Sequence, residues 1–97
     1  MKIEIEKRND IPSGMEEYVR KRAKKLAKYL KEESLVRFVI SHQKGNFFTE
    51  ITSNDIGNIF HSKAFSPDLK LSIEGAIKKI EHQLKKFKER VVDHKKV

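Results

Sequence analysis

The sequence predicts a single α+β domain with the element order βαβββα, in which a four-stranded mixed sheet carries two helices packed on one face. Three observations predict this fold. The chain has only 97 residues, which leaves room for one domain, residues 1–97. Apolar residues recur at helical spacing in two segments. Four shorter segments alternate in polarity or are rich in β-branched and aromatic residues, and turn residues separate them.

The first strand and the first helix occupy the N-terminal third of the chain. The strand is predicted over residues 2–8, KIEIEKR, where Ile3 and Ile5 share one face. Ser13-x-x-Glu16 has the form of a capping box, which predicts that a helix begins there. The apolar stripe of this helix runs for about five turns and consists of Met15, Val19, Ala23, Leu26 and Leu30.

Three further strands are predicted in the middle of the chain. Their segments are LVRFVISH at 35–42, FFTEITS at 47–53 and NIFHSKAF at 58–65. The turns QKGN and NDIG connect them as hairpins. Most of the phenylalanines in these strands are expected in the core, although one or two can point outward, where stacking on nucleic-acid bases is the alternative.

The last helix is expected to open at Ser66-Pro67-Asp68, with a cap residue followed by a proline in the first turn. Its apolar stripe consists of Leu69, Ile73, Ile77, Ile80, Leu84, Phe87 and Val91. Gly75 interrupts this helix at a cost of about 1 kcal/mol relative to alanine, and the sequence alone offers no reason for it. The tail, residues 91–97, is expected to fray.

The composition argues against several classes of protein. The chain has no cysteine, so it has neither disulfides nor a thiol nucleophile. It shows no signal-peptide pattern and no apolar run near the roughly 20 residues of a membrane span, so we expect a cytoplasmic protein without a membrane partner. His42, His61, His82 and His94 lack metal-ligand spacing. We therefore expect no metal, no cofactor, no small-molecule substrate and no catalytic site.

The positive charge of the chain is confined to its two helical segments. The net charge is +8 at pH 7. Residues 12–33 hold seven Lys or Arg against four acids, and residues 69–97 hold nine against four, whereas the rest of the chain is balanced. Solvated surface is the alternative explanation for a single basic helix, but two helices with this excess favour an anionic polymer as partner.

Helical geometry at 100° per residue sorts these charges onto one flank of each helix. On the first helix, the flank consists of Tyr18, Arg22, Lys25 and Tyr29, with Lys21 and Lys28 just beyond. On the last helix, it consists of Lys79, Gln83, Lys86 and Arg90, with His82 adjacent. Glu74 and Glu81 are expected on the opposite flank of that helix. The two basic flanks are predicted to merge into a positive groove edged by tyrosines, which suits a phosphate backbone.

The two helical segments also resemble a known family. KIEIEKRNDIPSGMEEYVRKRAKKLAKYL and SPDLKLSIEGAIKKIEHQLKKFKER are similar to the ribosome hibernation-promoting factors, also called ribosome-associated inhibitors. The resemblance covers nearly the whole chain. It implies the same βαβββα fold, no enzymatic activity, and a stress-related function in which the neck of the small ribosomal subunit is occupied and translation is blocked.

The resemblance also implies which residues contact rRNA. The basic positions of the family match Arg22, Lys25, Lys28, Lys79 and Lys86. His82 stands where the family commonly has arginine, which weakens the claim of a permanent charge there. The partner implied is the small ribosomal subunit, with the chain a monomer off the ribosome. Since βββα packing with a basic helix also occurs in double-stranded RNA-binding domains, a general duplex-binding module is the alternative. The sequence leaves open whether this is a short form or part of a long form with a dimerising domain.

Overall fold

The structure, a computed structural model, describes residues 1–55 and 57–95, and of residues 91–95 the backbone alone. The predicted element order is confirmed. The elements are β1 (Lys2–Arg8), α1 (Met15–Ala23), the 3₁₀ helix η1 (Lys24–Tyr29), β2 (Leu35–Gln43), β3 (Asn46–Asp55), β4 (Asn58–Ser66) and α2 (Leu69–Lys95). The described helices do not combine the length and apolar character needed to cross a membrane.

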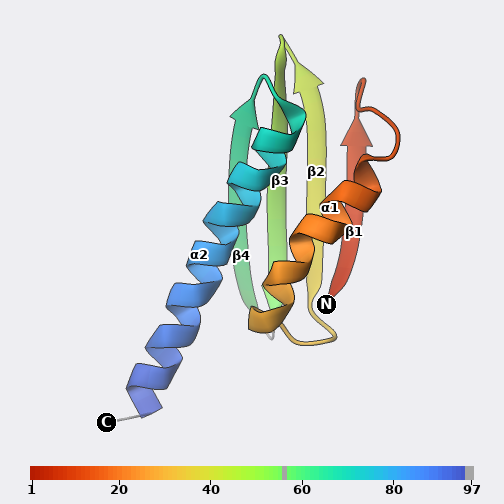
Figure 1. Cartoon of the computed structure of the whole chain (residues 1–97). Helices are drawn as coiled ribbons and strands as arrows, with labels where there is room; N and C mark the ends of the chain where they lie inside the picture. Colours follow the sequence, from red (N-terminus) through yellow and green to blue (C-terminus); the bar gives the residue numbers. More distant parts are fainter. Residues whose placement is uncertain (56, 96–97) are drawn as a thin grey trace.

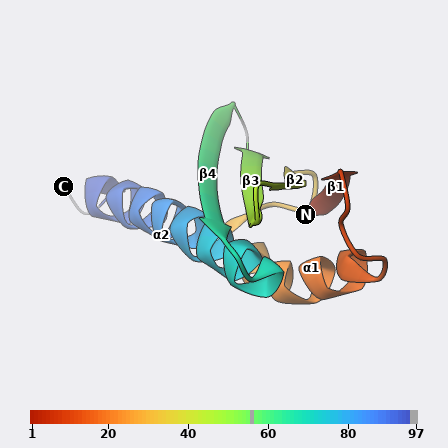
Figure 2. The ribbon, with the colours of Figure 1, turned by 90° about the horizontal axis from the view of Figure 1, so that it is seen from above.

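The four strands form one mixed sheet in the order β1-β2-β3-β4 (Figure 1). β1 runs parallel to β2, and the other neighbours are antiparallel. The β2–β3 hairpin turns at Lys44 and Gly45, whose φ angles are 50° and 80°. Positive φ at both central residues is the hairpin geometry that glycine favours. Both helices lie on one side of the sheet, which leaves its other face open (Figure 2).

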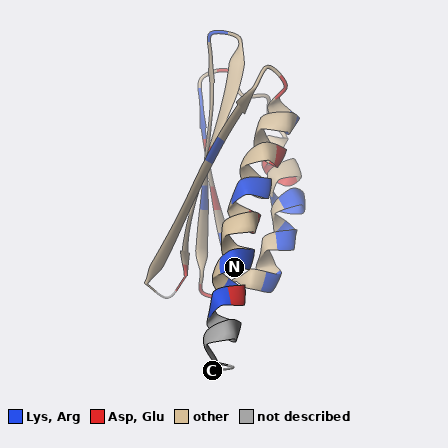
Figure 3. Cartoon of the chain, turned by 90° about the vertical axis from the view of Figure 1, so that its left-hand side faces the viewer, with Lys and Arg blue, Asp and Glu red and all other residues tan. Residues whose placement is uncertain are grey.

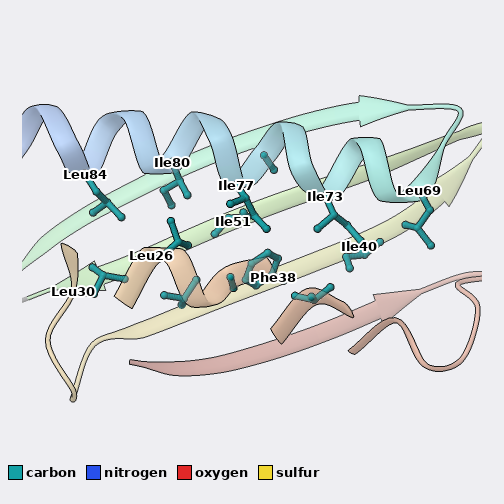
Figure 4. Close-up of a cluster of buried hydrophobic side chains, with 14 residues drawn as sticks. Leu26, Leu30, Phe38, Ile40, Ile51, Leu69, Ile73, Ile77, Ile80 and Leu84 are labelled. Atoms are coloured by element: carbon teal, nitrogen blue, oxygen red, sulfur yellow. The ribbon is translucent and has the colours of Figure 1, made fainter. Parts of the chain in front are cut away.

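The core lies between the sheet and the helical layer (Figure 4). Ile5, Phe38, Ile51 and Ser62 are aligned across the four strands. The helices bury the apolar stripes that the sequence predicts. Val19, Ala23, Leu26 and Leu30 come from the first helical segment, and Leu69, Ile73, Ile77, Ile80 and Leu84 come from α2. Burial of these side chains is the main favourable contribution to folding.

Small side chains let α2 lie close to β3 and β4. The hydroxyl groups of Thr49 and Ser72 are 2.9 Å apart and fully buried, and the Ser62 hydroxyl donates to the Ala76 carbonyl at 2.8 Å. At Gly75, a Cβ atom would lie 3.1 Å from the Cβ atom of Ala64. The glycine that weakens the helix therefore removes a steric conflict with the edge strand.

This contact predicts a non-additive effect of alanine at Gly75. In the wild-type background, we expect Gly75→Ala to gain little or none of the roughly 1 kcal/mol that alanine contributes to a helix, because the new methyl group meets Ala64. In an Ala64→Gly background, the same substitution should gain about that amount. Urea unfolding of the four variants measures the coupling, and equal effects in both backgrounds would contradict the steric explanation.

The start of each helix differs from the prediction. The N-cap of α1 is Gly14, with a φ of 86° and no side-chain cap bond, so the expected capping box of Ser13 and Glu16 is wrong. Glu16 instead pairs with Lys7 of β1, with 3.1 Å between Nζ and Oε1. At α2, the cap is Asp68, whose carboxylate accepts the Leu71 amide at 3.1 Å. The expected opening at residue 66, with a proline in the first turn, is therefore also wrong. The contact of Glu16 is with another element, whereas the cap of α2 is a local contact that the sequence interpretation assigned to the wrong residue.

The end of the first helix also differs from the prediction of one helix of about five turns. The α-helical part stops at Ala23, and residues 24–29 continue as a 3₁₀ helix. A 3₁₀ helix has three residues per turn, so Lys25 and Lys28 lie on one line along its surface. At the C-terminus, the backbone of α2 is helical to Lys95. The prediction that residues 91–97 fray concerns the side chains of residues 91–95 and all of residues 96 and 97. These lie outside the part of the chain that the structure describes.

Candidate nucleic-acid interface

The basic flank of the first helical segment packs against α2. The Tyr18 hydroxyl donates to Glu74 Oε1 at 3.0 Å. Arg22 binds both oxygens of Glu74, with 2.8 Å between Nη2 and Oε2. Lys25 Nζ lies 3.7 Å from Glu81 Oε1. Glu74 and Glu81 thus lie, as predicted, on the other flank of α2 from Lys79 and Gln83, but it is this acidic flank that faces the basic residues of the first helical segment.

The opposite flank of α2 turns toward the edge of the sheet. Lys79 Nζ donates to the carbonyl of Lys63 at 2.9 Å, and Gln83 Nε2 donates to the carbonyl of His61 at 2.7 Å. Both acceptors belong to β4, the edge strand. Lys79 and Gln83 thereby bond to backbone carbonyl groups of β4 that no neighbouring strand pairs with. The predicted merging of the two basic flanks is therefore only partial. Lys79 and Gln83 share a cleft with Lys28 and Tyr29 of the first helical segment, whereas Lys86 and Arg90 do not line it.

Residues of both basic flanks form a cleft with neighbouring residues where η1 and α2 meet. We call it the inter-helix cleft, and its volume is about 740 Å³. It is lined by Lys28, Tyr29, Lys78, Lys79, Glu81, His82, Gln83 and Lys85. Four lysines thus face a single carboxylate. Figure 3 shows Lys and Arg positions gathered in blue on the helical layer. A concave surface with this excess of cations attracts phosphate groups.

The structure divides the predicted site residues into three groups. Four of them line the inter-helix cleft, namely Lys28, Tyr29, Lys79 and His82. Three lie at the contact between the helices, namely Tyr18, Arg22 and Lys25. Three are exposed and do not line the cleft, namely Lys21, Lys86 and Arg90. The sequence interpretation missed Lys78 and Lys85 as site residues.

Ion pairing changes the electrostatics of the helix contact. The pKa of Glu74 is lowered, mainly by the hydrogen bond from Arg22. The pKa of Tyr18 is raised, first by burial and then by its hydrogen bond to Glu74. The guanidinium of Arg22 is thereby neutralised in place and holds the two helices together. The lysines of the cleft carry the charge that is available to a ligand.

A pH dependence follows from the lowered pKa of Glu74. A carboxylate with a depressed pKa contributes stability that is complete above its unfolded pKa, near 4.5, and is lost as the pH falls through the lower folded value. We expect Glu74→Gln to be about 1 kcal/mol less stable than wild type at pH 7, a value discounted for solvent around the half-exposed Arg22. Near pH 3 the difference should shrink.

Thermal unfolding of wild type and Glu74→Gln at both pH values measures this effect. Glu17→Gln is the matched control, because Glu17 is exposed and forms no ion pair among the described residues. A Glu74→Gln difference that is the same at pH 7 and pH 3 would contradict the assigned role of the ion pair.

The described residues include no group of three or more His, Cys, Asp or Glu side chains that could hold a metal ion. The side chains that line the inter-helix cleft are instead ammonium groups, an imidazole, an amide and a phenol, together with one carboxylate. All of these groups except the carboxylate can donate hydrogen bonds to anionic oxygens. The arrangement can neutralise several phosphates at once.

Comparison with known proteins places the chain in a family. A family model described as "Sigma 54 modulation protein / S30EA ribosomal protein" matches residues 3–92. The chain belongs to this family. The predicted resemblance to ribosome hibernation factors is thereby confirmed, and the S30EA family is a family of ribosome-associated proteins. A search of curated proteins finds no match.

Two solved structures share the fold of this S30EA family member. "Crystal structure of Thermus thermophilus Protein Y N-terminal domain" matches with a TM-score of 0.79 and 25% identity, over 90% of this chain and 99% of that one. "Structure of an ribosomal subunit interface protein from Coxiella burnetii" matches with a TM-score of 0.76 and 19% identity, over 92% and 99%. The second likeness concerns the fold alone.

Proposed function

We propose that the chain is a non-catalytic translation inhibitor that binds the small ribosomal subunit. In this proposal, the inter-helix cleft lies against rRNA phosphates, and the folded body fills the channel that mRNA and tRNA otherwise occupy. Inhibition is steric exclusion. The chain acts in the cytoplasm during hibernation of idle ribosomes, is a monomer off the ribosome, and uses no cofactor or small-molecule substrate.

One observation carries the proposal. In a member of the S30EA family, four lysines from two helical elements converge on one cleft that contains a single carboxylate. None of these lysines forms an ion pair with a carboxylate among the described residues. Cations without such partners can release the counterions of a phosphate backbone, which is the main source of affinity for nucleic acids.

Co-sedimentation with purified small subunits tests the proposal. If at least four phosphates are contacted, log Kd should change with log salt concentration with a slope of about 3 or steeper. A tRNA anticodon stem-loop bound with a short mRNA should compete with the chain. Subunit binding that these ligands leave unchanged would contradict the occupied channel.

A filter-binding comparison separates this function from that of a general duplex reader. The chain is expected to bind small subunits much more tightly than an isolated RNA duplex of about 20 base pairs, because the ribosomal channel surrounds it whereas a duplex contacts one side. Equal affinities for the two would favour the duplex-binding module.

A further inference from the structure

We propose that the open face of the sheet is a second RNA-binding surface, on which unpaired bases of single-stranded RNA stack on Phe48 and Phe65. This face lies on the side of the sheet away from both helices (Figure 2). The inference goes beyond the proposed function, because it does not require the inter-helix cleft.

The two phenylalanine rings form an exposed platform. Phe48 of β3 and Phe65 of β4 are directly opposite each other, and their ring centroids are 5.7 Å apart with an interplanar angle of 28°. They are 39% and 69% exposed. The close approach has a backbone cause. Since the carbonyls of His61 and Lys63 bond to α2, the backbone polar groups of alternate β4 residues point away from β3, which makes Phe48 and Phe65 a close, non-hydrogen-bonded pair.

A hollow of about 540 Å³ adjoins the two rings. This is within the usual size of small-ligand sites. Its polar lining includes Arg8, Ser41, Gln43 and Lys63. Lys63 forms no ion pair among the described residues, whereas Arg8 pairs with Glu6. Arg8 and Lys63 of the sheet outnumber the one carboxylate in the lining, that of Glu50.

Aromatic rings among cations favour RNA over a second copy of the chain. Stacking two copies face to face would bring two surfaces with more cations than carboxylates together, in molecules that each carry a net charge of +8. Single-stranded RNA matches both features, because bases stack on the rings and phosphates meet the cations. Sheet-based modules recognise RNA with aromatic side chains on neighbouring strands. The bases of a duplex, already stacked, cannot use this platform.

The test replaces both rings by leucine. The double variant Phe48→Leu/Phe65→Leu keeps the apolar character of the pair but removes the aromatic faces. Fluorescence anisotropy with a fluorescein-labelled oligouridylate octamer measures single-strand binding, and a labelled blunt-ended RNA duplex measures duplex binding. We expect the variant to bind the octamer at least 5-fold more weakly, since each stacked base accounts for roughly 5- to 150-fold. Affinity for the duplex should not change.

Leu71→Ala is the matched control, because Leu71 is an apolar side chain of α2 that is 62% exposed and does not line the hollow. It should bind the octamer as wild type does. Circular dichroism and thermal unfolding verify that the leucine variant folds. If part of the double variant is unfolded, the single variant Phe65→Leu replaces it in the binding experiment, because Phe65 is the more exposed of the two rings.

Three results would overturn the proposal. The first is that wild type fails to bind the octamer, and the second is that wild type and the leucine variant bind it with equal affinity. The third is a concentration-dependent dimer of wild type in sedimentation velocity that the leucine variant does not form. That result would identify a second copy of the chain as the occupant. The cleft variant Lys28→Glu/Lys78→Glu/Lys85→Glu separates the two surfaces. In this cleft variant, replacing the two rings by leucine should still weaken binding of the octamer. This should hold even if the cleft variant does not bind small subunits.

Discussion

Replacing Lys28, Lys78 and Lys85 together by glutamate is expected to lower the affinity for small ribosomal subunits by roughly 100-fold or more. These are three of the four lysines that line the inter-helix cleft. Each substitution removes a charge-assisted hydrogen bond to phosphate and adds a repulsive charge, and a single such bond contributes about 1.5–3 kcal/mol. The salt dependence should weaken as well, with the slope reduced by roughly 0.7–0.9 for each phosphate that the variant no longer neutralises.

Quantitative co-sedimentation at several salt concentrations measures both effects. The matched control is Lys2→Glu/Lys24→Glu/Lys31→Glu, which changes the net charge equally at three exposed lysines outside the cleft. We expect this control to weaken binding only modestly, through the overall field of the protein. Equal decreases in affinity for both triple variants would mean that net charge, and not the cleft, accounts for binding.

The strands could be predicted within about two residues because their signals are local. Alternation of polarity sets the faces of β1, and Gly45, a residue that tolerates the positive φ of a tight hairpin, marks the first hairpin in the sequence. The start of α1 could not be predicted in this way. Ser13 and Glu16 have the spacing of a capping box, yet the Glu16 carboxylate pairs with Lys7 of β1. Competition between a local and a distant partner is decided by the tertiary structure.

The position of the cationic surface could be predicted only in part. Helical periodicity correctly separates the two flanks of α2, but it does not say which flank faces the first helix. That depends on the chain path, which places α1 and α2 side by side on one layer (Figure 2). One signal was available in the sequence. Glu74 and Glu81 lie two turns apart on one side of α2, and Arg22 and Lys25 lie about one turn apart on the first helical segment, so opposite charges were available for ion pairs between the two segments.

This pairing changes how Arg22 and Lys25 are interpreted. The sequence predicts both as RNA contacts, and in the free protein both are occupied by carboxylates of α2. In the free protein, both ion pairs connect the first helical segment to α2. The four lysines of the cleft form no ion pair among the described residues and remain available for phosphates.

The largest expected effect on stability comes from Phe38, which belongs to the core between the sheet and the helices. Phe38 is the largest fully buried side chain and lies on β2, a central strand, where it is paired with Ile5 and Ile51. Figure 4 shows its ring among the side chains that the helices contribute to the core. Phe38→Ala is expected to destabilise the protein by about 3–5 kcal/mol, because apolar burial is reduced and a cavity remains.

A decrease of this size is a large part of the total for a chain of this length, because small domains are stable by only about 5–15 kcal/mol. Urea unfolding at 25 °C measures the decrease, with Leu71→Ala as the control for an exposed apolar side chain, which should cost less than about 0.5 kcal/mol. A Phe38→Ala cost near that of Leu71→Ala would contradict this packing of the core. Because Phe38 does not line the cleft, Phe38→Ala protein that remains folded should bind small subunits more weakly only in proportion to its unfolded fraction.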